Sequence, residues 1–393
     1  MAEIPASNFF RMPAEWEPHR ATWLAWPHRR SDWPGKSRVI PHVYGEIIRV
    51  LSRHEDLHIV VQSNVERVAA RRILRKYAPR AGNVHWEVFE TDRSWLRDSG
   101  PIFAFSPGAN HASVGSAASV GSAASVGSAA SVGSAQGRGV LSAEPGFAAG
   151  AKKVALDWRF NAWAKYDDWT HDDLLPTYVA ACLKCESPQP HHDGRRVVLE
   201  GGSIDVNGAG LMLTTEECLL SGVQERNPGF GRADYEAVFA RYLGVKKVLW
   251  LNKGIAGDDT HGHVDDLARF VGPRTIVTVV EDDPADANYG PLRENLERLR
   301  GFTDLAGGKL EIVPLPMPRP MHYSGQRLPA SYANFYIANG VVLVPTFNDP
   351  ADRIALGILA ELFPEREVVG IHSVDLVWGL GTLHCMTQQE PAG

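Results

Sequence analysis

The chain has 393 residues, of which 44% are hydrophobic and 22% charged, a composition typical of a folded globular protein. Its formal net charge of −6 offers no basic face for nucleic acid and mildly favours cationic small molecules. No segment is apolar for long enough to span a bilayer, and the N-terminal stretch lacks the pattern of a signal peptide. We therefore expect a cytoplasmic protein that binds neither nucleic acid nor membranes.

The first predicted elements are a strand at 21–27, a helix at 39–51 and a strand at 57–61. A second helix is predicted at 64–79, where a proline ends it. Helices that cover one side of a sheet carry an apolar stripe, and the expected stripe of this second helix is Val65, Val68, Ala69, Ile73 and Tyr77.

Residues 113–135 repeat a six-residue pattern of Ser, Ala, Val and Gly. The pattern has no apolar face to bury, so it predicts a flexible surface insertion, at about 107–150, within a single domain that spans 1–393. A tolerated expansion of an exposed loop is favoured over a functional lid, because lengthening such a loop costs little.

The four cysteines are Cys182, Cys185, Cys218 and Cys385. They are too few and too unevenly spaced for a disulfide framework, so we expect reduced thiols. Cys182 and Cys185 precede His191 and His192, which makes a zinc site conceivable, but no second ligand pair has the usual spacing. The sequence favours ordinary helix cysteines there and predicts neither a metal nor a cofactor.

One unit recurs along the chain with a period of roughly 65 residues: two extended runs, a helix and a further strand. The clearest copies begin at 196, 262 and 332, and a fourth is suggested on either side of the insertion. A fifth would be split between 379–389 and 21–61, and chain ends that complete one unit indicate a closed array. The alternative is an open doubly wound sheet. It is disfavoured because the sequence has no glycine-rich phosphate loop at a strand-to-helix turn.

Polar residues recur at matching places in these units. Glu200 ends the first strand of one unit, and His263 and Asp265 open the first strand of the next. Asp98 directly precedes another such strand, and Cys385 lies in the split unit. In a closed array these places converge, and so many acidic groups would be costly to desolvate unless a cationic ligand compensated them.

The residue types restrict the reaction. A thiolate needs a base or a positive partner, for which His263 is the candidate, and Glu200 could orient that imidazole. Asp98 and Asp265 would then accept the parallel N–H bonds of a planar guanidinium. Judged singly, each residue has a structural explanation, such as a packed cysteine or an ion pair. Their shared position in the repeat favours a common site for hydrolysis at a guanidine carbon.

Five motifs in order resemble those of the agmatine deiminase and bacterial peptidyl-arginine deiminase family of guanidino-group modifying enzymes: RMPAEWEPHRATWLAWP, SWLRDSGP, LEGGSIDV, DDTHGHVDDLARF and GTLHCMTQQEP. The resemblance covers nearly the whole chain apart from the insertion. It implies a closed five-bladed α/β propeller of ββαβ units, the pentein fold. It also implies conversion of a guanidine to a ureido group without a metal or cofactor.

Carried over by position, the resemblance implies that Cys385 attacks the guanidinium carbon and forms a thiouronium. His263 would act as acid and then base with Glu200 as its partner. Asp98 and Asp265 would bind the guanidinium, and Trp95 would form a wall of the pocket.

Two stretches depart from agmatine-specific members, which tend to carry Asn-Asp before the tryptophan and a run of glycines before the cysteine. Here they are DRSW and GLGTLHC. The reaction class is therefore better defined than the substrate. Asp92 and the acidic stretch 258–260 are candidates to bind the far amine of agmatine, and the aromatic stretch 160–169 is expected at the same mouth.

We predict an agmatine deiminase of polyamine synthesis or arginine breakdown, whose partner is a small cationic guanidine substrate. The sequence does not determine whether the chain forms a homo-oligomer. The first alternative is another activity of the family, on free or peptidyl arginine or as an amidinotransferase. The second is a non-enzymatic, polyamine-binding repeat protein, for which replacing Cys385 would change nothing.

Overall fold

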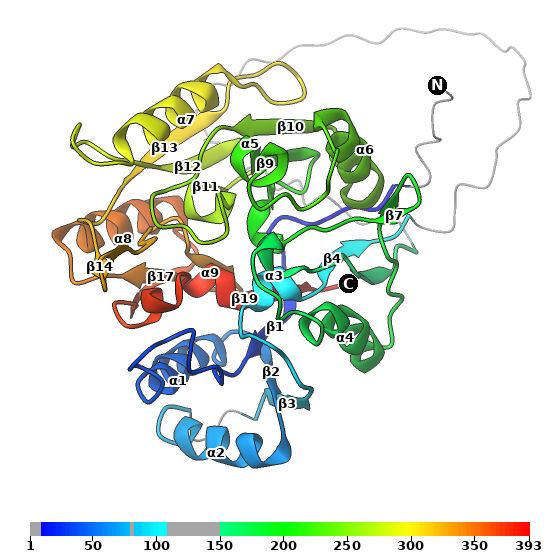
Figure 1. The fold of residues 1–393 in the computed structure, drawn as a ribbon, viewed down its shortest axis with the longest axis vertical. Helices are drawn as coiled ribbons and strands as arrows, with labels where there is room; N and C mark the ends of the chain where they lie inside the picture. Colours follow the sequence, from blue (N-terminus) through cyan, green and yellow to red (C-terminus); the bar gives the residue numbers. More distant parts are fainter. Residues whose placement is uncertain (1–8, 79–81, 108–149) are drawn as a thin grey trace, which may run out of the picture.

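The computed structural model describes residues 9–78, 82–107 and 150–393, so the predicted insertion lies outside the described residues. The structure is mixed α/β. Figure 1 shows the longer helices around the outside, with strands further in and two short helices, α3 (Leu96–Ser99) and α9 (Leu383–Met386), near the middle.

The predicted repeat unit is seen most simply in the middle of the chain. Strand β8 (Asp205–Val206) pairs antiparallel with β9 (Leu211–Thr215) across the predicted Asn-Gly turn. Helix α6 (Arg232–Leu243) then returns the chain, so that β10 (Lys247–Leu251) pairs parallel with β9. The helix ends at Gly244, whose φ of 71° is the left-handed conformation that favours glycine.

Two further units repeat this order of antiparallel pair, helix and parallel strand. One comprises β11 (Ala268–Phe270), β12 (Thr275–Val280), α7 (Tyr289–Gly301) and β13 (Glu311–Pro316). The other comprises β16 (Tyr336–Ala338), β17 (Val341–Thr346), α8 (Pro350–Leu362) and β18 (Glu367–His372). The predicted copies at 262 and 332 are thereby confirmed.

The split unit is also present, because the two ends of the chain share one sheet. Strand β19 (Thr387–Pro391) pairs antiparallel with β1 (His19–Ala25). After α1 (Ile40–Leu51), β2 (Asp56–Val61) pairs parallel with β1. Helix α2 (Asn64–Leu74) leads to an additional parallel strand, β3 (Val84–Val88).

The remaining unit brackets the insertion. Strands β4 (Ile102–Phe105) and β5 (Lys153–Leu156) pair antiparallel, and α4 (Leu175–Leu183) follows them. In place of a full third strand, Val154 forms a single parallel bridge with Glu186. Small two-stranded hairpins, β6–β7 (His191–His192, Arg195–Arg196) and β14–β15 (His322–Tyr323, Gln326–Arg327), lie outside the units.

The stripe predicted for the second helix is confirmed for Ile73 and Tyr77, which pack against the core, but is wrong for its first half. The exposed fractions of Val65 and Val68 are 81% and 61%, and the buried residues of α2 are Ala70 and Leu74. The helix is capped by Ser63 and contacts α1, β2 and β3 mainly through its second half. The apolar residues of the first turn therefore face outward.

The local structure at the site also differs from the prediction. Glu200, His263 and Asp265 do not end or open strands; they lie on single turns of 3-10 helix, η4 (Gly201–Ser203) and η5 (Val264–Asp266), which they cap or form. These turns contact each other, and α3 contacts both η4 and α9. The short helices thus bring residues from distant units together. None of the helices described is long and apolar enough to cross a membrane.

Candidate active site

Cys385 lies on α9 at the bottom of a pocket of about 440 Å³. Its side chain is almost buried, and its Sγ atom accepts a hydrogen bond of 3.1 Å from Nδ2 of Asn334. Oδ2 of Asp265 lies 3.8 Å from the sulfur. Burial raises the pKa of the Cys385 thiol well above its ordinary value, and the charges of Asp265, Asp266 and Asp98 raise it further.

His263 is buried between two carboxylates. Its Nε2 atom lies 3.5 Å from Oε2 of Glu200, and its Nδ1 atom lies 3.8 Å from Oδ1 of Asp98. Neither ring nitrogen makes a hydrogen bond within the described residues. Burial disfavours the imidazolium, but Asp98, Cys218 and Glu200 outweigh it and hold the pKa of His263 well above the usual value. The ring is therefore poised to carry a proton.

Glu200 is fixed by an arginine that the sequence analysis missed. Nε of Arg226 donates to both carboxylate oxygens, at 3.1 and 3.3 Å, and both side chains are fully buried. Burial alone would raise the pKa of Glu200, but the charges of Arg226 and His263 hold it below the ordinary value. Glu200 thus stays ionised beside His263.

Asp98 is held in place by two donors. The backbone N–H of Gly202 donates to Oδ1 at 3.0 Å, and the Nε1–H of Trp163 donates to Oδ2 at 2.9 Å. Burial raises the pKa of Asp98 to about 6, even though His263 opposes the shift. The side chain therefore changes charge near the lower end of the physiological pH range.

Gly202 is where the polar residues converge. A Cβ atom there would lie 2.5 Å from Nδ1 of His263, 2.9 Å from Oδ1 of Asp98 and 3.0 Å from Oδ2 of Asp265. Contacts this short exclude any side chain. The Gly-Gly pair after Glu200 therefore lets three functional side chains approach one backbone.

Behind Asp265 lies a buried charge network that was also missed. The two ring nitrogens of His384 each lie 2.7 Å from a carboxylate oxygen, one of Asp265 and one of Glu15. Glu15 in turn pairs with Arg97 and Arg269. His384 and Glu15 fall inside the quoted motifs, which was the signal available for them.

Asn334 had a signal of its own, since it lies in the unit that begins at 332, near the places occupied by Glu200 and His263 in theirs. Its Oδ1 atom accepts from Thr382 and from the backbone N–H of His384, while its amide donates to Cys385. Asn334 therefore sets the position of the nucleophilic sulfur.

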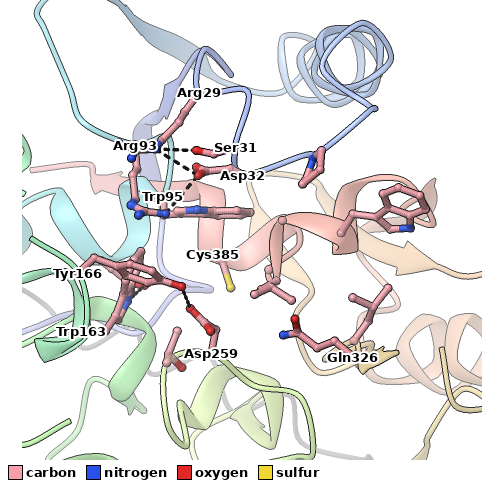
Figure 2. A pocket seen from close by; sticks show the side chains of 18 of the residues that line it. Arg29, Ser31, Asp32, Arg93, Trp95, Trp163, Tyr166, Asp259, Gln326 and Cys385 are labelled. Carbon is pink, nitrogen blue, oxygen red and sulfur yellow. Dashed lines mark hydrogen bonds and ion pairs between the residues drawn. The ribbon is translucent and has the colours of Figure 1, made fainter. Parts of the chain in front are cut away.

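Figure 2 shows Cys385 pointing into a space enclosed by Trp95, Trp163, Tyr166 and Asp259. Trp95 is the predicted wall. The aromatic stretch contributes Trp163, Tyr166 and Asp168, and the acidic stretch contributes Asp259 and Thr260, so both predicted stretches do line the pocket. The Tyr166 hydroxyl donates to Asp259 at 2.7 Å.

The predicted residues divide between the lining and the layer behind it. Cys385, Asp98 and Trp95 line the pocket, whereas His263, Glu200 and Asp265 lie in the layer behind it. Asp92 is not brought to the lining. Its carboxylate instead accepts from the backbone of His171 and Asp172 and pairs with the His171 ring. It shapes the loop that carries Arg93 and Trp95.

Glu200, Cys218 and His263 offer ligand atoms within 4.8 Å of one another, the one such group found among the described residues. This group includes none of the four residues considered for zinc in the sequence, Cys182, Cys185, His191 and His192. Cys182 is exposed at the end of α4. Arg226 already occupies both oxygens of Glu200, which disfavours this carboxylate as a ligand.

Comparisons with known proteins agree with this geometry. The profile of the Porphyromonas-type peptidyl-arginine deiminase family matches residues 11–391. An agmatine deiminase from Ectopseudomonas mendocina is 30% identical over 100% of this chain and 98% of its own. A solved agmatine deiminase of Enterococcus faecalis has a TM-score of 0.79 at 29% identity and covers 100% of this chain and 99% of its own.

A further solved structure, a C. jejuni agmatine deiminase with substrate bound, has a TM-score of 0.79 at 26% identity, with 100% of this chain and 99% of that chain covered. Sequence and structure therefore match along essentially the full length. The chain belongs to the Porphyromonas-type peptidyl-arginine deiminase family.

Proposed function

We propose that the chain is an agmatine deiminase, a hydrolase that converts agmatine and water to N-carbamoylputrescine and ammonia, in polyamine synthesis or arginine breakdown. One observation carries the proposal: the Cys385 thiol lies at the bottom of a pocket with the carboxylate of Asp265 3.8 Å away. A flat guanidinium fits beside such a pair, because its N–H groups can bond the carboxylates while its carbon faces the sulfur.

In the first step the guanidinium donates N–H bonds to Asp98 and Asp265. Its positive charge offsets the carboxylates that raise the pKa of Cys385, so the thiol ionises as substrate binds and its proton leaves to solvent. The thiolate attacks the guanidinium carbon. His263, charged beside Glu200, gives its proton to one nitrogen, and the C–N bond breaks to release ammonia and leave a thiouronium on Cys385.

In the second step His263 is neutral and takes a proton from water, whose oxygen attacks the thiouronium carbon. The C–S bond breaks, the proton left on the new oxygen passes to the departing sulfur as the C=O bond forms, and the ureido product leaves Cys385 as the thiol. His263 is then protonated again, so one water is consumed and one ammonia is formed in each cycle. Glu200, held by Arg226, keeps the imidazole oriented through both proton transfers.

Agmatine is favoured as substrate by the charge of the lining, which carries four aspartates: Asp32, Asp98, Asp168 and Asp259. Two arginines, Arg29 and Arg93, oppose them, and both are already paired with Asp32 and Asp168. A doubly cationic ligand fits this excess of acid. Free arginine is the second candidate, because the same two arginines could meet a carboxylate.

We also propose that the five units close into a five-bladed propeller, the pentein arrangement, and that 1–393 is one catalytic domain. The antiparallel pairing of β19 with β1 supports closure, because it makes the chain ends complete one unit. A cytoplasmic location and action on a small guanidine belong to the same proposal.

The decisive experiment is an assay of ammonia release from agmatine, arginine, a peptidyl arginine and methylated arginines, without any amine acceptor. We expect the highest kcat/KM for agmatine and complete loss of turnover in Cys385→Ala and His263→Ala. Ammonia release that required an amine acceptor would instead assign an amidinotransferase. Absence of ammonia release from every guanidine by the wild type would favour the polyamine-binding protein, and full activity of Cys385→Ala would overturn Cys385 as the nucleophile.

A further inference from the structure

A second pocket, of about 460 Å³, shares no lining residue with the active-site pocket. Three segments enclose it: the stretch 159–169, the end of the β6–β7 hairpin with the residues that follow it, and the loop 226–230. The last of these segments begins with Arg226, the residue that holds Glu200. The second pocket therefore adjoins the catalytic machinery from outside the substrate site.

The charge of this pocket is opposite to that of the active site. Its lining contains the four arginines Arg159, Arg195, Arg196 and Arg226 and no acidic residue. Arg196 is neutralised by Asp157 and Asp173, and Arg226 by Glu200. Arg159 and Arg195 form no ion pair with a carboxylate in the part of the chain that the structure describes. Two arginines without an ion-pair partner among the described residues thus face one cavity in a protein whose net charge is −6, and only Arg159 is near enough to a carboxylate, that of Asp173, to affect its pKa.

Both of these cations are held in place by aromatic rings. The guanidinium of Arg159 lies 5.4 Å from the ring centre of Trp169, and that of Arg195 lies 5.1 Å from Phe230. Nη1 of Arg195 also donates to the backbone carbonyl of Pro228 at 2.9 Å. Cation–π contacts restrict long side chains before a ligand arrives, so less conformational entropy is lost on binding. The guanidinium fork itself matches phosphate or carboxylate oxygens.

We propose that this pocket binds a small anion, a phosphate or a carboxylate, held by Arg159 and Arg195 beside Arg226. The known bonds of Arg226 use one N–H of each of its nitrogens, to Glu200, Gln224 and Thr260. Two of its five N–H groups remain for an anion in the pocket.

Binding would also reach the active site, a consequence that rests on the function proposed above. A bound anion would partly neutralise the charge of Arg226, which stabilises the carboxylate of Glu200. Oε2 of Glu200 lies 3.5 Å from Nε2 of His263. Glu200 then attracts protons more strongly and orients the imidazole less firmly. We therefore expect the anion to lower kcat rather than to compete with substrate, and so to leave KM nearly unchanged.

The test is calorimetric titration of the full-length chain with inorganic pyrophosphate and, separately, with citrate. The variants are Arg159→Gln and Arg195→Gln. Arg241→Gln is the matched control, because Arg241 stacks on Tyr242 at 5.1 Å, as Arg195 does on Phe230, but lies outside the pocket. Each pocket variant should weaken binding roughly tenfold, with ammonia release in the absence of anion unchanged. The control should bind as the wild type does.

The two titrants separate a phosphate site from a carboxylate site by their order of affinity. Absence of binding of either anion to the wild type, or an equal loss in all three variants, would overturn the proposal. Because titration does not depend on turnover, these outcomes are distinct from failure of the deiminase assignment. Binding that left kcat unchanged would refute only the coupling through Arg226.

Discussion

Gly202 and His263 are in such close contact that a Cβ atom on the glycine would lie 2.5 Å from Nδ1 of the imidazole. Gly202→Ala must therefore displace the imidazole, together with Asp98 and Asp265. A displacement of about 1 Å costs a catalytic site about 100-fold in rate, and we expect at least that loss in kcat/KM. Gly222→Ala is the control, since no atom lies within 4 Å of its Cβ position. Wild-type ammonia release by Gly202→Ala would contradict the geometry.

The second prediction concerns the resting state of Cys385. Burial and the nearby carboxylates of Asp265 and Asp98 raise the pKa of the thiol well above its ordinary value. Without substrate, its alkylation by iodoacetamide should therefore still accelerate from about pH 7 to about pH 9. Mass spectrometry of the Cys385 peptide is the measurement, because Cys182 is exposed and reacts as well.

A plateau of that rate below about pH 7 would indicate a preformed thiolate. Asp265→Asn supplies the internal check. Removing this negative charge stabilises the thiolate, so the alkylation profile should move to lower pH even though turnover is lost.

The third prediction is an acidic limit to activity. Asp98 must be ionised to accept N–H bonds from the guanidinium, and burial raises its pKa to about 6. The ionised form is lost as pH falls through that value, so kcat/KM should decline below about pH 6, approaching tenfold per pH unit. Asp32 also lines the pocket with a pKa raised to about 6. Asp32→Asn should keep the limit if Asp98 causes it, and loss of the limit in that variant would assign it to Asp32.

Much of the fold could be predicted because the same pattern of hydrophobic and turn residues repeats along the sequence. Alternating strands, an Asn-Gly turn and amphipathic helices recur along the chain. The same pattern predicts the split unit, in which β19 pairs with β1. The stripe of α2 could not be placed, because apolar residues occur on several faces of that helix. Which face is buried depends on how the helix packs on α1, β2 and β3, and the pattern of its own residues does not determine that packing.

For the site, residue types at matching places identified the residues that converge on Gly202. The sequence analysis did not identify the residues that hold these side chains in place. Arg226 and Asn334 reach Glu200 and Cys385 across long sequence separations, and only Asn334 occupies a matching place in its unit. Asp92 was expected to meet substrate because it is acidic and near Trp95, but backbone N–H groups of the next loop already satisfy its carboxylate.

That loop contact gives the fourth prediction. The buried carboxylate of Asp172 accepts from the backbone N–H groups of Asp92 and Arg93, at 2.9 and 3.2 Å. Asp172→Ala leaves both donors without a partner, which should lower the free energy of unfolding by about 1–3 kcal/mol. Because the same loop carries Trp95, KM should rise as well. Asp282→Ala, at an exposed aspartate far from this loop in the sequence, should change neither quantity in denaturant unfolding or steady-state assays.

The fifth prediction concerns metals. Every step derived above is carried out by side chains, so dialysis against EDTA should leave ammonia release unchanged. Added Zn²⁺ should inhibit, because Cys218 and His263 offer two neighbouring ligand atoms even though Arg226 disfavours Glu200 as a third, and zinc on His263 would take the lone pair that must receive a proton. EDTA should then restore the rate. Cys218→Ser should resist this inhibition more than Cys182→Ser, which removes an exposed thiol. Loss of activity in EDTA alone would mean that the reaction uses a metal.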